Sequence, residues 1–532
     1  MNSKNFIWKK IFQLCLAVSV YFYSCYIGDR GIYLFDFSIT YNMGWLIFNG
    51  WVPFTDFKMP LMPLSGILTA LGFWLFGVKY YSAVKLAGII CAIGVLLIGK
   101  KLEKYLGSFF GYIAAAMIVL ATVPITGTLY YNHLSMLLFS VYLVLVMDFI
   151  LEYKVFSGRR ETFSSAMIYL FIALMVFNKL HIGVMAGMLF LGLEGSFFLR
   201  EKNRLKDVVQ HVAIRLMAPF IFAAALLIWV NFNVLDLIDS VLHSAKTSSY
   251  VNNNSLMKRI GIGDEGVFSV AVIGVHLIIF FAIGLIFYHL KFCKKNVLMN
   301  ALVCFLAVAP VVQVISFISS AEAPSIDVVF IMVYLVMVYV YFTKTLDVKN
   351  NVEARRVQFI CAIFVSSLFL PCAMFTMHYS SKYLRKSYDE NTAIFSSQYR
   401  VPRNKHNAEN YFFSKVSITD AQKKNFNYLD QVLKDSKTEK VFFGPELEMF
   451  YPATAKFPPK RWPVWMHADV SYNSDNHLQM REIFMNQKYD IIFLSKNRYG
   501  FTSFVNDYIL SEYVELKQVD PEVWIRVFIK KK

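Results

Sequence analysis

The segment YLFDFSITYNMGWLIFNGWVPFTDFKMPLMPL, residues 33–64, is as apolar as a membrane-spanning segment but carries Asp36, Asp56 and Lys58. A charged side chain among apolar neighbours is costly unless it faces a partner, water or a polar cavity. If the segment is helical, Asp36, Thr40 and Gly44 recur four residues apart on one face. Two interpretations follow: an interfacial helix whose Asp36 points to headgroups or caps a neighbour, or one wall of a functional site.

The rest of the chain has the composition of a protein that crosses a membrane several times. Of its 532 residues, 57% are hydrophobic and only 17% are charged, which differs from the balance of a soluble domain. The first apolar run, residues 11–27, is too long for a removable signal peptide and lacks a small-residue cleavage site. We therefore expect a retained first helix in a polytopic membrane protein.

The net charge of +17 comes from clusters of lysine and arginine that lie between the apolar runs. Loops rich in these residues stay on the cytoplasmic side of a membrane, so the charge does not indicate a nucleic-acid partner. If all the clusters are cytoplasmic, an even number of spans separates each from the next. The clusters are Lys4, Lys9 and Lys10; Lys100, Lys101 and Lys104; Lys154, Arg159 and Arg160; Arg200, Lys202, Arg204 and Lys206; Lys291, Lys294 and Lys295; and Lys344, Lys349, Arg355 and Arg356.

This parity condition selects the apolar runs that cross the membrane. Of the three runs between the first two clusters, residues 60–77 are short and interrupted by Pro60 and Pro63, so we place them on the outer side without crossing. The fold class is a polytopic α-helical membrane protein with about eleven transmembrane helices, the N-terminus inside and the C-terminus outside. The predicted spans are residues 11–27, 82–99, 109–125, 134–151, 164–178, 181–199, 213–235, 267–290, 297–320, 326–343 and 357–375.

The spans belong to a transmembrane domain, residues 1–376, whose first external loop, residues 28–81, is expected to contain amphipathic helices. Residues 377–418 are charged and irregular and are expected to form a linker. Residues 419–532 are expected to form an extracytoplasmic α/β domain, since strands and helices alternate there. Its strands are KVFFG, YDIIFLS, 513–519 and 523–529, the last two joined by a turn at residues 520–522, and its helices are 419–433, 475–487 and 501–510.

The opening segment has a recognisable motif. Asp36, then GWLIFNGWVPFTDFKMPLMPL and LGFWLFG, resembles the first external loop of the GT-C superfamily of membrane glycosyltransferases, which includes protein O-mannosyltransferases and aminoarabinose transferase. That loop runs from an acidic residue through a Gly-x-x-Pro-Tyr-x-Asp-like turn, here residues 50–57, to a Leu-Phe-Gly ending. The chain departs from the family where Phe37 follows Asp36, where Phe54 replaces tyrosine, and where the paired prolines are separated as Pro60 and Pro63.

The resemblance implies transfer of a monosaccharide from a polyprenyl-phosphate donor to a lipid-linked or envelope glycan acceptor on the extracytoplasmic face. Such a reaction needs a carboxylate that accepts the acceptor's proton and cations that stabilise the departing phosphate. By match to the loop, Asp36 is the expected general base. Asp56 is the second acidic position, which would orient the acceptor, or a divalent cation if one is used. Two carboxylates are a weak metal signal, so we assign no metal-site residues and no definite cofactor, and keep a divalent cation as the open alternative.

Lysines on the outer side are the expected ligands of the donor phosphate. These are Lys58, Lys85, where similar transferases often have arginine, and Lys179, where they often have lysine. Each has a structural alternative: Lys58 as a partner of Asp56, Lys85 as a snorkelling side chain, and Lys179 as an interfacial anchor. Further residues expected to line the site are Thr40, Asn132, His133 and Glu322.

Two other functions fit a polytopic chain with outer carboxylates. A transporter or flippase of lipid-linked sugars would place charges in mid-span and often shows an internal repeat, which we do not find. An oligosaccharide polymerase or ligase is expected to have a large, late external loop, whereas the late loops here are short. The lysine-rich inner loops and the absence of cysteine from the C-terminal region suit a bacterial plasma membrane. Besides the donor and the acceptor, we expect membrane lipids as partners.

Overall fold

The chain was analysed as a computed structural model. It describes residues 3–29, 32, 35–59, 61–123, 128, 130–152, 159–200, scattered positions between 213 and 238, 305, 332–340, 406–407, 411–414, 416–418, 420–445, 447–466, 477–495, 503–517 and 523–531. Glu322 and the predicted spans 267–290 and 357–375 lie outside these residues, as do all but one position of 297–320, most of 213–235 and half of 326–343.

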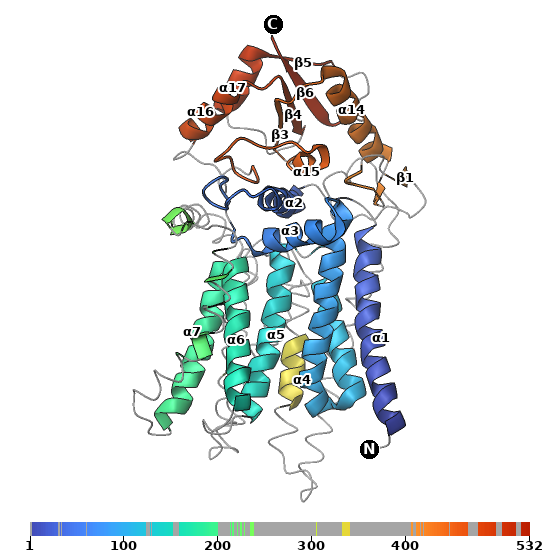
Figure 1. The fold of residues 1–532 in the computed structure, drawn as a ribbon, viewed down its shortest axis with the longest axis vertical. Coiled ribbons are helices and arrows are strands. Elements are labelled where there is room, and N and C mark those ends of the chain that lie inside the picture. The colour runs from blue at the N-terminus through green and yellow to red at the C-terminus, as the bar shows by residue number, and fades with distance from the viewer. Residues whose placement is uncertain are drawn as a thin grey trace, which may run out of the picture.

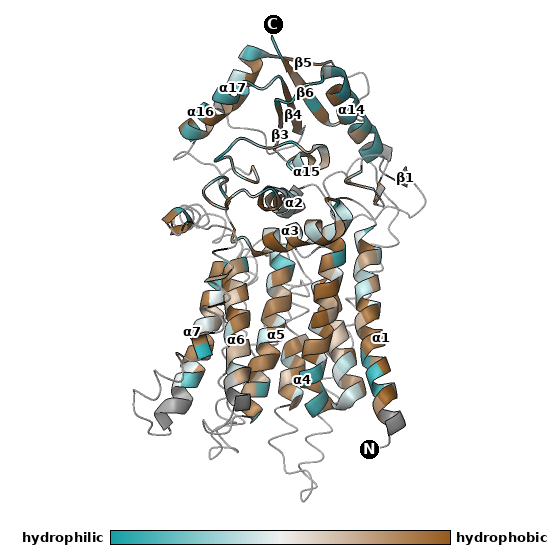
Figure 2. Cartoon of the chain, in the orientation of Figure 1, coloured by the Kyte–Doolittle hydropathy of each residue, from teal (hydrophilic) through white to brown (hydrophobic). Residues whose placement is uncertain are grey.

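The lower part of the molecule is a bundle of apolar helices that run along its long axis (Figures 1 and 2). Its described helices are α1 (Ser3–Gly28), α4 (Tyr80–Thr122), α5 (Tyr131–Glu152), α6 (Arg159–Asn178) and α7 (Leu180–Arg200). By length and composition, Phe6–Gly28, Tyr80–Thr122 and Tyr131–Glu152 can cross a membrane, and Phe163–Asn178 and Leu180–Gly195 are shorter apolar helices. The bundle therefore has the character of a membrane domain.

The 43-residue helix α4 is a hairpin of two helices that meet at Gly107, whose φ of 75° suits glycine. The two halves pack closely, because a Cβ on Gly111 would lie 2.7 Å from the backbone nitrogen of Glu103, and one on Gly99 would meet the ring of Tyr112. Two antiparallel helices in this range agree with the predicted separate spans 82–99 and 109–125.

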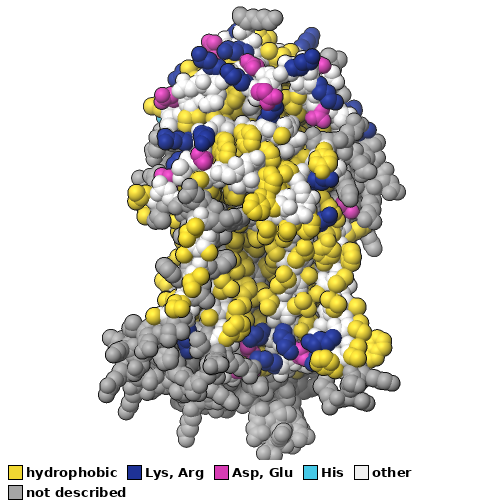
Figure 3. All heavy atoms as spheres, in the orientation of Figure 1, with side chains coloured by type: hydrophobic (Ala, Val, Ile, Leu, Met, Phe, Trp, Pro, Cys, Tyr) yellow, Lys and Arg dark blue, Asp and Glu magenta, His cyan; other side chains and the backbone are white. Residues whose placement is uncertain are grey.

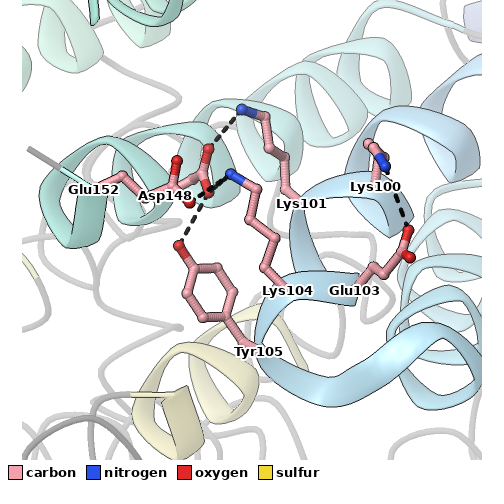
Figure 4. Close-up of polar contacts among 7 residues, drawn as sticks. All are labelled: Lys100, Lys101, Glu103, Lys104, Tyr105, Asp148 and Glu152. Carbon is pink, nitrogen blue, oxygen red and sulfur yellow. Dashed lines mark hydrogen bonds and ion pairs between the residues drawn. The ribbon is translucent and has the colours of Figure 1, made fainter. Parts of the chain in front are cut away.

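Charged side chains gather at the end of the bundle away from the C-terminal domain, below a band of hydrophobic side chains (Figure 3). Asp148, near the end of α5, accepts hydrogen bonds from Lys101 at 2.5 Å, Lys104 at 2.8 Å and Tyr105 at 3.0 Å (Figure 4). Lys9 of α1 pairs with Glu103 at the same end. The first two basic clusters thus lie at one end of the bundle, as the parity condition requires.

Two short helices separate the bundle from the C-terminal domain: α2 (Phe35–Phe48) and α3 (Leu64–Phe76) (Figure 1). With 13 residues, α3 is about 20 Å long, too short to cross a bilayer core, in agreement with the non-crossing assignment. The expectation of amphipathic loop helices was wrong for α2. All side chains of residues 37–47 are buried, because protein covers α2 on both sides, so the helix needs no polar face.

The C-terminal domain contains the predicted α/β pattern. Strands β3 (Val441–Phe443), β4 (Ile491–Ser495), β6 (Ile525–Lys530) and β5 (Tyr513–Glu515) form a sheet in that order. β3 and β4 are parallel, with Val441 opposite Ile491, and the other pairs are antiparallel. Its helices are α14 (Asp420–Ser436), α15 (Phe450–Thr454), α16 (His477–Gln487) and α17 (Ser503–Glu512).

The two faces of the sheet pack against different helices, since alternate strand residues point to opposite sides. Phe442 and Ile492 belong to a core with Phe484 of α16, whereas Phe443 and Phe493 join the core that continues into α2 and the bundle. The end of the predicted linker is part of this packing. Strands β1 (His406–Asn407) and β2 (Ser417–Ile418) pair, and Phe412 and Phe413 between them are buried.

Candidate functional site

The C-terminal domain holds the turn that follows α2. Lys58 forms an isolated parallel bridge with Pro463: its N–H donates to Trp462 O at 3.0 Å, and Val464 N–H donates to Lys58 O at 2.9 Å. Within the turn, Gly50 and Phe54 both have positive φ, 81° and 67°. Phe54 is fully buried, which compensates for the unfavourable conformation of a non-glycine residue there.

Asp56 is the charged centre of this turn. Its Oδ2 accepts the Val52 N–H at 2.9 Å, and its Oδ1 accepts the Lys460 ammonium at 2.9 Å. Burial alone would raise the pKa of Asp56, but the Val52 N–H and the Lys460 charge together lower the pKa below its ordinary value. The polar contacts that the structure gives Asp56 therefore anchor the turn to the C-terminal domain, through Lys460 rather than Lys58.

The other end of α2 lies against the bundle. The ring of Phe37, in the first turn of α2, packs on the ring of Tyr130 at 4.9 Å, just before α5 begins. Asp36 precedes Phe37 in the same turn. The first turn of α2 and the N-terminal end of α5, some hundred residues apart in the sequence, therefore meet in the structure.

Lys179 and Asn132 come together at this place. Lys179 lies between α6 and α7, is 6% exposed, and donates from Nζ to Asn132 Oδ1 at 2.9 Å; its Nζ is also 5.6 Å from the ring centre of Tyr131. A buried ammonium must be compensated by hydrogen bonds or by an anion. The N-terminus of α5 lies beside it and contributes partial positive charge from its first N–H groups.

Asn178 fixes this junction and was not among the predicted site residues. Its Nδ2 donates to Tyr131 O and to Ser135 Oγ, both at 2.7 Å, and the side chain is fully buried. Its position as a polar residue at the end of an apolar run, next to Lys179, was the available sequence signal. Asn178 joins α6 to the first turn of α5 and so sets the place of Lys179 relative to Asn132.

Two predicted lining residues have buried polar atoms without a hydrogen-bond partner in the described part of the chain: Thr40 Oγ1 and His133 Nδ1. Thr40 shares a face of α2 with Asp36 and Gly44, and Gly44 packs against α3, where a Cβ would lie 2.5 Å from Thr69 Cγ2. The ring of His133 lies 6.0 Å from that of Tyr130. His133 thus lies beside Tyr130 at the start of α5, Thr40 lies one helical turn before Gly44 on α2, and each side chain has capacity for one more hydrogen bond.

The remaining predicted lysine, Lys85, lies elsewhere. Its ammonium is 5.2 Å from the ring centre of Phe76 and 5.7 Å from that of Tyr81, contacts that suit the structural alternative of a side chain packed on aromatic surface. Among the described residues, no group of three or more His, Cys, Asp or Glu could hold a metal ion.

No protein-family model matches the sequence, and no curated protein matches it. Similar solved structures include ArnT from Cupriavidus metallidurans bound to undecaprenyl phosphate, with 12% identity, a TM-score of 0.48, and coverage of 98% of this chain and 97% of that chain. The apo state of ArnT has 10% identity, a TM-score of 0.43, and coverage of 99% and 98%.

An oligosaccharyltransferase from Archaeoglobus fulgidus, in complex with Zn and sulfate, is also similar, with 12% identity, a TM-score of 0.44, and coverage of 90% of this chain and 68% of that chain. ArnT is a GT-C aminoarabinose transferase.

Proposed function

We propose that this protein is a membrane glycosyltransferase of the GT-C type. It transfers a monosaccharide from a polyprenyl-phosphate donor to a lipid or glycan acceptor on the outer side of the membrane. The observation that supports this most directly is the packing of the first turn of α2, which contains Asp36, on the outer end of α5 beside Lys179 and Asn132. A carboxylate-bearing turn and a buried cation thus meet at the end of an apolar bundle.

In the proposed reaction, a hydroxyl or amine of the acceptor attacks the anomeric carbon of the sugar. The bond from this carbon to the phosphate oxygen breaks, and its electron pair stays on the polyprenyl phosphate. The proton of the acceptor moves to the carboxylate of Asp36, which is the general base. Thr40, one helical turn further along the same face, is available to hydrogen bond the sugar or the acceptor through its unpaired hydroxyl.

Lys179 is the proposed ligand of the donor phosphate. Its ammonium is held by Asn132 in a buried setting, where an ionic contact is stronger than in water. The N–H groups of the first turn of α5 add to the attraction for an anion. The lipid tail of the donor would then lie along the apolar bundle. Asp56 supports the site by holding the turn after α2 against Lys460 of the C-terminal domain.

The test begins with the identity of the donor, read by mass spectrometry from the polyprenyl-phosphate sugar that accumulates when the gene is deleted. Purified protein in lipid nanodiscs is then assayed for transfer from this donor in the presence of cell-envelope acceptors. We expect Asp36→Asn to bind the donor normally and to lose transfer by about 100-fold or more. Lys179→Gln should weaken donor binding, whereas Lys100→Gln, at the opposite end of the bundle, should change neither.

Full transfer by a folded Asp36→Asn protein would exclude Asp36 as the base. Wild-type protein that moves the donor between leaflets without transferring its sugar would contradict the glycosyltransferase proposal and favour a transporter of lipid-linked sugars.

A further inference from the structure

Three side chains on one face of α2 donate hydrogen bonds to the C-terminal domain. Asn42 Nδ2 donates to Val464 O at 2.9 Å, and Trp45 Nε1 donates to Lys456 O at 2.9 Å. One turn earlier, Ser38 Oγ donates to Glu448 Oε2 at 3.4 Å, and Glu448 Oε1 accepts the Met466 N–H at 2.9 Å. The spacing of four and three residues puts all three donors in a single stripe along the helix.

The opposite face of α2 is turned toward α3. Gly44 lies against Thr69, and Met43 contacts Gly66. At about 100° per residue, the stripe of Asp36, Thr40 and Gly44 lies about 180° around the helix from the stripe that binds the C-terminal domain. By helical register, the bonds to the C-terminal domain therefore decide which way the Asp36 face of α2 is turned.

Hydrophobic burial by itself does not fix this orientation, because it is non-directional and residues 37–47 are buried all the way around α2. If α2 rotated about its axis, most of its contacts would exchange one buried apolar side chain for another. The rotation would also leave the buried Asn42 and Trp45 donors and their carbonyl acceptors unpaired, which costs far more than a normal hydrogen bond contributes. The directional bonds thus select one rotation of α2.

We infer that Asn42 and Trp45 are positioning residues: by binding the Val464 and Lys456 carbonyls, they fix the rotation of α2 about its axis, and with it the direction of the face that Asp36, Thr40 and Gly44 share by helical register. The C-terminal domain is therefore part of the catalytic unit, acting through α2. The inference rests on the proposed function for its consequence in catalysis, and on the hydrogen bonds alone for its consequence in structure.

The chain offers a conservative variant and a matched control. Trp45→Phe keeps an aromatic ring between Phe48 and Phe457, on which Trp45 stacks, but removes the Nε1 donor; Asn42→Leu keeps the volume and removes the Nδ2 donor. The control is Tyr513→Phe, which removes a buried hydrogen bond of the C-terminal domain, from Tyr513 OH to Tyr489 O at 2.8 Å. The control bond lies in the C-terminal sheet and does not involve α2.

Two measurements test the inference on full-length protein in nanodiscs. In Trp45→Phe/Asn42→Leu, we expect kcat for sugar transfer to fall by about 10- to 100-fold with KM for the donor unchanged. Hydrogen exchange of the amides of residues 35–48 should become faster. Trp45→Phe alone, the milder variant, should show a smaller effect of the same sign, and Tyr513→Phe should change neither measurement.

An unchanged kcat in the double variant, or an equal loss in Tyr513→Phe, would overturn the positioning role. Hydrogen exchange remains informative if the wild-type protein transfers no sugar: the proposed function then fails, whereas faster exchange in α2 would still support the structural part. Unaltered exchange in the double variant would overturn that part.

Discussion

Asp56 illustrates how the environment of one residue decides its role. From the sequence, its expected partners were the acceptor substrate, a divalent cation if one is used, and the neighbouring Lys58. In the structure its carboxylate accepts the Val52 N–H and the ammonium of Lys460, a residue more than four hundred positions away. Lys460 is largely exposed, so the pair is solvent-screened and contributes little to stability by itself, about 1 kcal/mol or less.

The pH dependence of this pair gives a first prediction. The folded-state pKa of Asp56 is lowered, so its stabilising contribution is complete above the ordinary carboxylate pKa of about 3.9 and is lost as the pH falls through the lowered value. Asp56→Asn should therefore lower the thermal stability of the protein slightly at pH 7. The difference from wild type should disappear at the acid end of a series of melting curves.

The control for Asp56 is Lys460→Gln, which should cause a similar loss at pH 7. The double variant should be no less stable than either single variant, because the two residues act as one pair. Additive losses would show that Asp56 and Lys460 stabilise the protein separately.

Lys179 and Asn132 are a second case at the residue scale, in which the sequence predicted the location of the residues but not the contact between them. The sequence placed both on the outer side and suggested phosphate binding for the lysine. Their direct hydrogen bond, and the role of Asn178 in joining α6 to α5, depend on side-chain directions at a helix junction. Hydropathy and parity carry no information on those directions.

At the scale of elements, two glycines with different structural roles allow α4 to form a hairpin. Gly107 supplies the positive φ of the turn, while Gly111 allows the second helix to approach the backbone of Glu103. Parity of the basic clusters predicted that two spans lie here. It did not predict that the turn between them would be a single residue, because the charge pattern fixes sides and not loop geometry.

The second prediction concerns this close approach. In Gly111→Ala, the added Cβ would lie 2.7 Å from the nitrogen of Glu103, so the two helices must separate, at a cost of about 1–3 kcal/mol. Gly192→Ala is the matched control, since no atom lies within 4 Å of its Cβ position in α7 and alanine favours helix by up to about 1 kcal/mol. Thermal unfolding in detergent should show a loss of stability for Gly111→Ala only. Equal stability of the two variants would contradict the close packing.

For α2, the sequence predicted the helical face correctly but not its surroundings. Asp36, Thr40 and Gly44 do share a face, and Gly44 packs against Thr69. The amphipathic character expected of an external helix is missing because the C-terminal domain covers the face that would otherwise meet water. Contacts such as Asn42 with Val464 join segments more than four hundred residues apart, beyond the reach of any local pattern.

At the scale of the whole molecule, polarity changes along the long axis. Charged residues lie on the C-terminal domain and at the opposite end of the bundle, and hydrophobic side chains cover the region between them (Figure 3). This is the distribution expected of a chain that places its bundle in the apolar layer of a membrane. The lysine-rich end is expected to face the cytoplasm by the positive-inside rule.

The third prediction tests this orientation with two cysteines in an otherwise cysteine-free chain. Leu478, on α16, is 67% exposed, and the side chain of Lys100, at the other end of the bundle, is 64% exposed. In intact spheroplasts, a membrane-impermeant maleimide should label Leu478→Cys, and should label Lys100→Cys only after permeabilisation. The reverse pattern would invert the topology and place Asp36 and Lys179 on the cytoplasmic side.

The sequence by itself determined the membrane character of the chain, the presence of two helices within residues 80–122, and the order of strands and helices in its C-terminal domain. These properties follow from hydropathy, charge and residue periodicity, which act locally along the chain. The tertiary structure alone decided that the C-terminal domain covers one face of α2, that Asp56 pairs with Lys460, that Phe37, next to Asp36, packs on Tyr130, and that Lys179 donates to Asn132. These features depend on hydrogen bonds and packing between segments that are distant in the sequence. The directions of such contacts are defined only once the chain has folded.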